Sequence, residues 1–189
     1  MEIGKIVVSR VDDVSCLSDF HCGVESMDAF IHSNLQDSID NLYCKAYIVK
    51  IDNEIVAFFA LSFDSIELLP QEVYNVVYRN DLTIDIIGNY NDIFLDKSSF
   101  PSIEIAYLAV RNDMRGKELG TCIIDIIREK ALYQDFAGCQ FLTVVPLNQV
   151  SYSAVGFYEK LGFVRKDNNA QKDGVYYSPL RIFKGCWEY

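Results

Sequence analysis

A short segment near the middle of the chain has the residue types that bind a phosphate group. Residues 115–121 read Arg-Gly-Lys-Glu-Leu-Gly-Thr, with two glycines that permit close backbone approach, two cations and a hydroxyl. We expect this segment to open a helix, where successive backbone N–H groups point the same way and attract anions. The segment therefore predicts a loop that binds a pyrophosphate.

The residues on both sides predict the elements that hold this loop. Ile103 to Val110 is predicted as a strand, Arg111 to Lys117 as a polar turn, and a helix is expected from about Glu118. The next predicted strand runs from Phe141 to Val145. On the helix, an apolar stripe is expected at Leu119, Cys122, Ile123, Ile126 and Ile127, and a solvent face at Asp125, Arg128, Glu129 and Lys130.

The N-terminal part predicts a strand, a helix and a hairpin. Residues 5–11 are strand-like, and a helix with apolar residues at three- and four-residue steps is expected after Gly23. Two β-rich runs, Ala46 to Ile51 and Ile55 to Leu61, flank the turn-forming pair 52–53 and predict an antiparallel hairpin. The expected apolar face of the helix consists of Met27, Phe30, Ile31, Leu35, Ile39 and Leu42.

The remaining segments differ in how clearly they predict structure. Residues 64–101 are interpreted as an insertion, in which 71–79 favours a helix, while 82–87 and 93–95 fit either strand or irregular structure. Residues 150–161 repeat apolar side chains at helical steps up to Gly162, a plausible helix stop. A closing strand is expected over Tyr176 to Phe183.

Composition favours one soluble, cytoplasmic domain over residues 1–189. Half of the 189 residues are apolar, and no window reaches the roughly 18 apolar residues of a spanning helix. The net charge of −10 favours cationic small molecules or basic peptide ends over nucleic acid as partners, although it leaves room for a local basic patch.

Cysteine and histidine spacing does not predict a metal site. The six cysteines lack a C-x-x-C pair, and His21 and His32 lie eleven residues apart, so reduced thiols and no metal are expected. A cysteine nucleophile is the alternative, but no histidine is close in sequence to any candidate that lies near the loop. For Cys122, on the apolar stripe, core packing is the favoured interpretation.

Two motifs together resemble the GNAT N-acetyltransferase family. Arg115 and Gly120 match the ends of its acetyl-CoA loop, although Glu118 occupies the position of the middle glycine. Asn148, Ala154 and residues 157–163 (Phe-Tyr-Glu-Lys-Leu-Gly-Phe) resemble its later helix and the segment beyond it. The likeness covers about 102–165 and implies an α/β fold: a mixed, mostly antiparallel sheet flanked by helices, with central strands that splay to admit acetyl-CoA.

The resemblance also implies roles for individual residues. Tyr158 would be the general acid, with a core tyrosine as the alternative, and Glu104 would be a general base, with a solvent-facing carboxylate as the alternative. Asn148 and Ser153 would contact the far side of the pantetheine or serve as turn and helix-start residues. The implied cofactor contacts are the backbone of Leu108, Ala109 and Val110 and the loop residues Arg115, Gly116, Lys117, Glu118, Leu119, Gly120 and Thr121.

Three functions are compatible with these residues. The favoured one is direct transfer of acetyl from acetyl-CoA to a primary amine of a small molecule or peptide. The second is a tRNA-acetylating toxin with an antitoxin partner, since 19–23 and 26–30 are similar to a Phe-Asp-Cys-Gly motif of the toxin-like subgroup, with His21 in place of its aspartate. The third is a non-catalytic acetyl-CoA-binding or partner-binding module, because Glu118 lies in the loop. A homodimer is left open.

Overall fold

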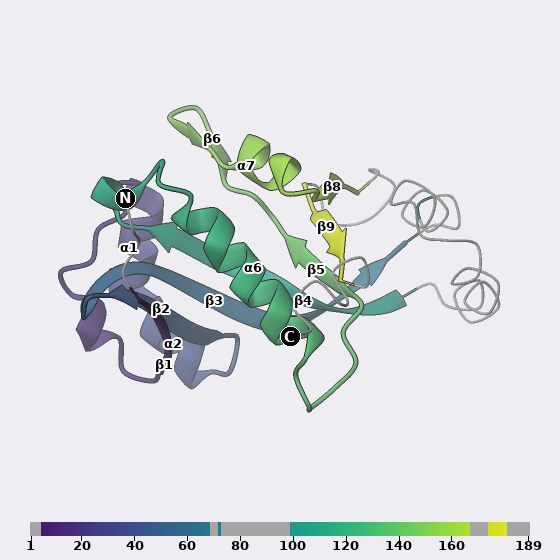
Figure 1. The fold of residues 1–189 in the computed structure, drawn as a ribbon, viewed down its shortest axis with the longest axis horizontal. Helices are drawn as coiled ribbons and strands as arrows, with labels where there is room; N and C mark the ends of the chain where they lie inside the picture. Colours follow the sequence, from purple (N-terminus) through teal and green to yellow (C-terminus); the bar gives the residue numbers. More distant parts are fainter. Residues whose placement is uncertain (1–4, 69–71, 73–98, 167–173, 181–189) are drawn as a thin grey trace. The chain divides into compact units, whose positions relative to one another are not determined.

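The computed structural model describes residues 5–68, 72, 99–166 and 174–180 (Figure 1). Seven strands form one sheet in the order β1-β2-β3-β4-β5-β9-β8, and β6 pairs with β7 in a separate hairpin. β4 and β5 are parallel, whereas β1–β2, β2–β3, β5–β9 and β8–β9 are antiparallel. The strands are β1 Ile6–Val11, β2 Lys45–Ile51, β3 Glu54–Glu67, β4 Ser99–Val110, β5 Phe141–Val144, β6 Asn148–Gln149, β7 Tyr152–Ser153, β8 Val164–Arg165 and β9 Tyr176–Pro179.

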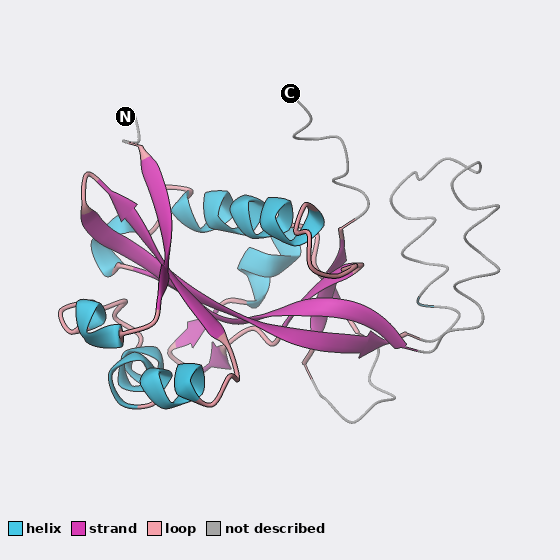
Figure 2. Cartoon of the chain, turned by 90° about the horizontal axis from the view of Figure 1, so that it is seen from below, coloured by secondary structure: helices cyan, strands magenta, loops and turns pink. Residues whose placement is uncertain are grey.

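Helices accompany this sheet, so the predicted α/β class with a mostly antiparallel sheet is confirmed (Figure 2). Among the described residues, no helix combines the length and the apolar character that crossing a bilayer requires. The α-helices are α1 Glu25–Ser33, α2 Leu35–Asp40, α6 Leu119–Leu132 and α7 Val155–Lys160, and the 3-10 helices are η1 Val14–Leu17 and η2 Asn112–Met114.

The chain forms two compact units. The first contains Met1–Ser62 and Ile105–Ile124, and the second contains Phe63–Glu104 and Asp125–Tyr189. β3, β4 and α6 each contribute residues to both units.

In the first unit, the predicted hairpin is confirmed. Asp52 and Asn53 have φ values of 50° and 67°, as a tight two-residue turn between antiparallel strands requires. The predicted long helix is wrong in one respect, because it is divided into α1 and α2 at Asn34, where the backbone leaves helical geometry. Leu42, expected on its apolar face, is 89% exposed with φ 61°.

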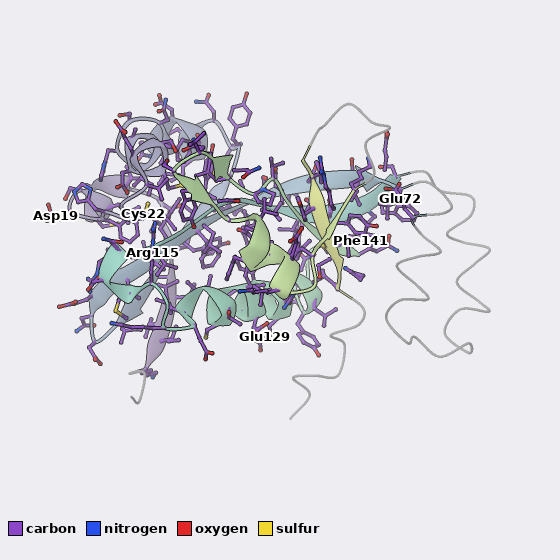
Figure 3. The ribbon with its side chains drawn as sticks, turned by 90° about the horizontal axis from the view of Figure 1, so that it is seen from above. Asp19, Cys22, Glu72, Arg115, Glu129 and Phe141 are labelled. Carbon is purple, nitrogen blue, oxygen red and sulfur yellow. The ribbon has the colours of Figure 1, made fainter. Side chains whose placement is uncertain are left out.

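In the second unit, side chains from β3, β4, β5 and β9 and from the residues next to these strands form an apolar cluster. Its members are Ile66, Leu68, Phe100, Phe141, Val175 and Tyr177. Phe141, labelled in Figure 3, packs edge-on against both Phe100 and Tyr177. β3 extends to Glu67 and β4 begins at Ser99, so the proposed insertion is shorter at both ends than 64–101. The helix and strands proposed for 71–95 lie outside the described residues, apart from residue 72.

Two helical predictions need correction. α7 begins at Val155, and Val150, expected on its stripe, is fully exposed between β6 and β7. On α6, Cys122 and Ile126 are half-buried, whereas Ile124 is buried. Arg128, predicted on the solvent face, is 4% exposed, because its guanidinium forms hydrogen bonds within the protein. Glu129 faces outward as expected (Figure 3).

The closing strand, predicted over Tyr176 to Phe183, is shorter in the structure. β9 ends at Pro179, and residues 181–183 lie outside the described part.

Candidate functional site

The loop before α6 has left-handed backbone conformations, which glycine favours, at one glycine and at one residue that is not glycine. Glu118 has φ 61° and Gly116 has φ 71°, both in the left-handed region. The N–H of Cys122 donates to the carbonyl of Glu118 at 3.1 Å, so the first turn of α6 starts at Glu118. The backbone N–H groups of the next three residues therefore precede the helical bonding pattern and can point toward an anion.

Leu119 is buried and anchors the helix start, whereas the charged loop residues are more exposed. Lys117 and Glu118 are exposed and Arg115 is half-buried. The loop therefore presents two cations and one carboxylate to whatever binds at the helix start. The carboxylate opposes anion binding there.

Arg111 fixes the strand end from which the loop departs. Its guanidinium donates to Asp113 at 2.7 and 3.0 Å and to Glu54 at 3.2 Å, and its backbone N–H donates to the carbonyl of Val56 at 2.9 Å. The hydrogen bond from Arg111 lowers the pKa of Asp113. Because two carboxylates neutralise Arg111, it holds the loop in place rather than supplying positive charge to a ligand.

The segment before α1 folds around the carboxylate of Asp28. Asp28 accepts hydrogen bonds from the backbone N–H groups of Cys22, at 2.8 Å, and Gly23, at 3.0 Å. Burial alone raises the pKa of Asp28, but these hydrogen bonds outweigh burial and the net pKa is lowered. The Cys22 thiol is buried and its pKa is raised to about 11, mainly by burial, so it is a poor nucleophile.

This segment lies against η2, next to the loop. Gly23 has φ 77°, and a Cβ placed on it would lie 3.3 Å from the side-chain carbon Cγ of Asn112. The backbone N–H of Asn112 also donates to the carbonyl of His21. Figure 3 labels Cys22 and Arg115 at the same end of the first unit.

β4 carries Glu104 and the predicted pantetheine-binding backbone, in different units. Glu104 is half-buried in the second unit. Residues 102–104 of β4 pair with residues 141–143 of β5, and Glu104, paired with Thr143, is the last residue of β4 in this register. Leu108, Ala109 and Val110 lie at the other end of β4, in the first unit, where Ala109 is buried.

Tyr158 is buried in α7, where it is 5% exposed. Its ring packs edge-on against Phe157 and Phe163, with ring centroids 5.0 and 5.3 Å apart. Burial, and secondarily the phenol of Tyr152, raises the pKa of Tyr158. The phenol therefore keeps its proton at neutral pH.

Asn148 and Ser153 are brought together as register partners in the β6–β7 hairpin, and both are exposed. The backbone N–H of Val155, the first residue of α7, donates to Ser153 Oγ at 3.4 Å, which is a local serine turn just before the helix. The second unit thus holds Glu104, Asn148, Ser153 and Tyr158, while the first holds the loop and residues 108–110.

Sequence reasoning missed two polar side chains near Glu104. The hydroxyl of Thr143 on β5 donates to the carboxylate of Asp64 on β3 at 2.9 Å. The signal was present in part, because Asp64 continues the alternating series of Ile66 and Leu68 and so belongs on the inward face of its strand.

The sequence matches one family profile, described as an acetyltransferase (GNAT) domain, over residues 43–165. No curated protein matches the chain. Among solved structures, a mutant of KacT aligns with TM-score 0.71 and 17% identity, covering 96% of this chain and 99% of that one. AtaT complexed with acetyl-methionyl-tRNAfMet aligns with TM-score 0.69 and 18% identity, covering 97% and 100%.

Because the family profile spans well over half of the chain, this protein belongs to the GNAT acetyltransferase family. The predictions of an acetyltransferase, of acetyl-CoA as its co-substrate and of the GNAT fold are thereby confirmed. At their level of identity, the two solved structures support the fold.

Proposed function

We propose that this protein transfers an acetyl group directly from acetyl-CoA to the amino group of an aminoacyl-tRNA. The observation that carries this acceptor is the likeness over 97% of the chain to AtaT, a protein solved with acetyl-methionyl-tRNAfMet. That likeness extends beyond residues 43–165 and includes α1 and α2. The Cys22–Gly23 turn held by Asp28 is the local counterpart of the Phe-Asp-Cys-Gly motif in the toxin-like subgroup.

Acetyl-CoA supplies the acyl group as a thioester, and the loop residues 115–121 bind its pyrophosphate in this proposal. The left-handed backbone at Glu118 supports the assignment, because the family has its middle glycine at this position. Backbone groups of Leu108, Ala109 and Val110 bind the pantetheine arm and polarise the thioester oxygen. Asn148 and Ser153 also contact the arm in this proposal.

Tyr158 is the proposed general acid and Glu104 the proposed general base. The phenol of Tyr158 carries its proton at neutral pH, as a donor to the departing thiolate must. Glu104, half-buried on β4, accepts a proton from the attacking amine, directly or through water. Residues 1–189 work as one acetyltransferase domain in this scheme.

Radiolabelled acetyl-CoA tests the acceptor. The full chain is incubated with aminoacylated total tRNA and, in parallel, with the same tRNA after deacylation. We expect acid-precipitable label only with aminoacylated tRNA, released by mild alkali that cleaves the ester. Label on deacylated tRNA, or no label with either, contradicts the proposal.

A small cationic amine or basic peptide is the second candidate acceptor. The net charge of −10 favours it, because a tRNA must overcome the average repulsion of the surface. Label that appears with polyamines or lysine-rich peptides, and not with aminoacyl-tRNA, selects this candidate.

A further inference from the structure

Two carboxylates share one face of the sheet in the second unit. Thr143 Oγ1 donates to Asp64 Oδ2 at 2.9 Å, although β4 lies between their strands. Neighbouring strands are about 4.8 Å apart, so these two side chains meet over β4. The β4 residue paired with Thr143 is Glu104. Asp64 and Glu104 therefore lie on the same face, at the same level of the sheet.

This acidic pair borders the apolar cluster. Asp64 lies two residues before Ile66 on one face of β3, and Glu104 follows Phe100 on the same face of β4. Both carboxylates are half-buried. A cation bound between them is therefore partly shielded from water, where charge attraction is stronger than at an exposed surface.

A buried hydroxyl lies beside the pair. Ser102 is 3% exposed, and its Oγ has no hydrogen-bond partner among the residues that the structure describes. It lies two residues before Glu104 and is paired with Phe141, so its side chain projects from the same face. A buried hydroxyl without a partner is costly, which indicates a polar group that a ligand completes.

We propose that Asp64, Glu104 and Ser102 form the binding subsite for the protonated acceptor amine. A primary ammonium group has three N–H donors, and these residues offer three acceptors. Thr143 orients the Asp64 carboxylate toward the site. Before transfer, one ammonium proton passes to the Glu104 carboxylate, which leaves a neutral amine and a protonated glutamate. The inference rests on the proposed amine acetylation and assigns residues to its acceptor.

A binding measurement without acetyl-CoA tests the subsite separately from turnover. The chain has three threonines, Thr83, Thr121 and Thr143, so methyl labelling of threonine gives a simple NMR spectrum. The full chain is titrated with methylammonium and, in parallel, with tetramethylammonium, which has the charge but no N–H donor. We expect a saturable shift of the Thr143 methyl signal with methylammonium alone. An equal shift with both ions overturns the proposal.

Charge-matched variants locate the effect. D64N should weaken methylammonium binding about tenfold, whereas E67Q, which removes an exposed carboxylate from the same strand, should bind like wild type. Equal binding by D64N and wild type, or equal loss in E67Q, overturns the proposal. Failure of acetyl transfer with normal methylammonium binding instead removes the proposed function and leaves the subsite.

Ser102→Ala separates a ligand role from a structural one. If the hydroxyl is completed by the amine, S102A weakens methylammonium binding several-fold, by about the loss of one hydrogen bond, and does not lower the Tm. A lowered Tm with unchanged binding shows that Ser102 supports the fold, and removes it from the subsite. If D64N does not fold, T143V, which keeps the Asp64 carboxylate but not its donor, replaces it; because T143V lacks the Thr143 methyl signal, its methylammonium binding is measured by calorimetric titration and should be weaker than that of wild type.

Discussion

The guanidinium of Arg128 on α6 donates a hydrogen bond from Nη2 to the main-chain carbonyl of Leu161, just past the end of α7. It also binds Asp125 at 3.1 Å and lies 5.6 Å from the ring centroid of Phe163. A cation at a helix C-terminus is favourable, because the last carbonyls carry partial negative charge. Arg128 thus joins α6 to the helix that carries Tyr158.

Arg128→Met should loosen α7. The substitution keeps much of the apolar stem but removes a charged hydrogen bond, so we expect a loss of about 1.5–3 kcal/mol in the free energy of unfolding, measured in urea. Turnover should fall with it, because α7 carries the proposed general acid. Lys130→Met, on the exposed face of the same helix, is the control and should change stability by about 0.5 kcal/mol or less. Equal urea midpoints for R128M and wild type contradict this prediction.

Tyr158→Phe should lower turnover and leave acetyl-CoA affinity nearly unchanged. Removing a general acid costs about 10²–10⁴-fold in kcat, while the buried ring keeps its packing against Phe157 and Phe163. Steady-state kinetics and calorimetric titration measure the two effects. Tyr176→Phe is the control, since that phenol contacts Glu159 at 3.4 Å in the same unit. Similar kcat values for Y158F and wild type remove Tyr158 from its role.

The fold was largely predictable because its signals are local. The pair Asp52 and Asn53 predicts the hairpin, and apolar periodicity predicts α6. Periodicity fails where the backbone of a single residue interrupts a helix. The apolar pattern runs unbroken past Asn34, yet α1 ends just before this residue and α2 begins just after it. The burial of Arg128 could not be predicted, because its acceptor lies 33 residues away, just past the end of another helix.

For the candidate site, the sequence predicts a loop that opens a helix, and the structure has the start of α6 at that position. Arg115 and Gly120 located the loop in the sequence although Glu118 replaces the middle glycine, and in the structure Glu118 has a left-handed φ of 61°. Asp64 and Thr143 are 79 residues apart, and the strand order brings them together. Sequence spacing alone does not contain that order.

Asp28→Asn should destabilise the protein near neutral pH and less so in acid. The carboxylate accepts two backbone hydrogen bonds, and an amide can accept only part of that pattern, so we expect a loss of about 1–2 kcal/mol. The folded-state pKa of Asp28 is lowered, so its stabilisation is present above the unfolded pKa and is lost as pH falls through the folded one. The difference between D28N and wild type should therefore shrink below about pH 4.

Urea unfolding at several pH values measures this difference. Asp19→Asn, at an exposed carboxylate in the same region (Figure 3), is the control and should follow wild type at every pH. A difference between D28N and wild type that stays constant down to pH 3 means that the charge of Asp28 contributes nothing.

Two substitutions at Glu118 separate its backbone from its charge. A non-glycine residue at φ 61° destabilises the folded state by roughly 1–2 kcal/mol. Glycine removes this strain, but its greater conformational entropy in the unfolded chain cancels part of the gain. Glu118→Gly should therefore stabilise the protein by about 0.5–1 kcal/mol and also tighten acetyl-CoA binding, because the carboxylate near the pyrophosphate is gone. Glu118→Gln should tighten acetyl-CoA binding to a similar degree without the gain in stability.

Calorimetric titration with acetyl-CoA at low and high salt checks the charge effect, which must weaken as the salt concentration rises. If E118Q binds acetyl-CoA no better than wild type at low salt, the carboxylate does not face the pyrophosphate and the loop assignment fails.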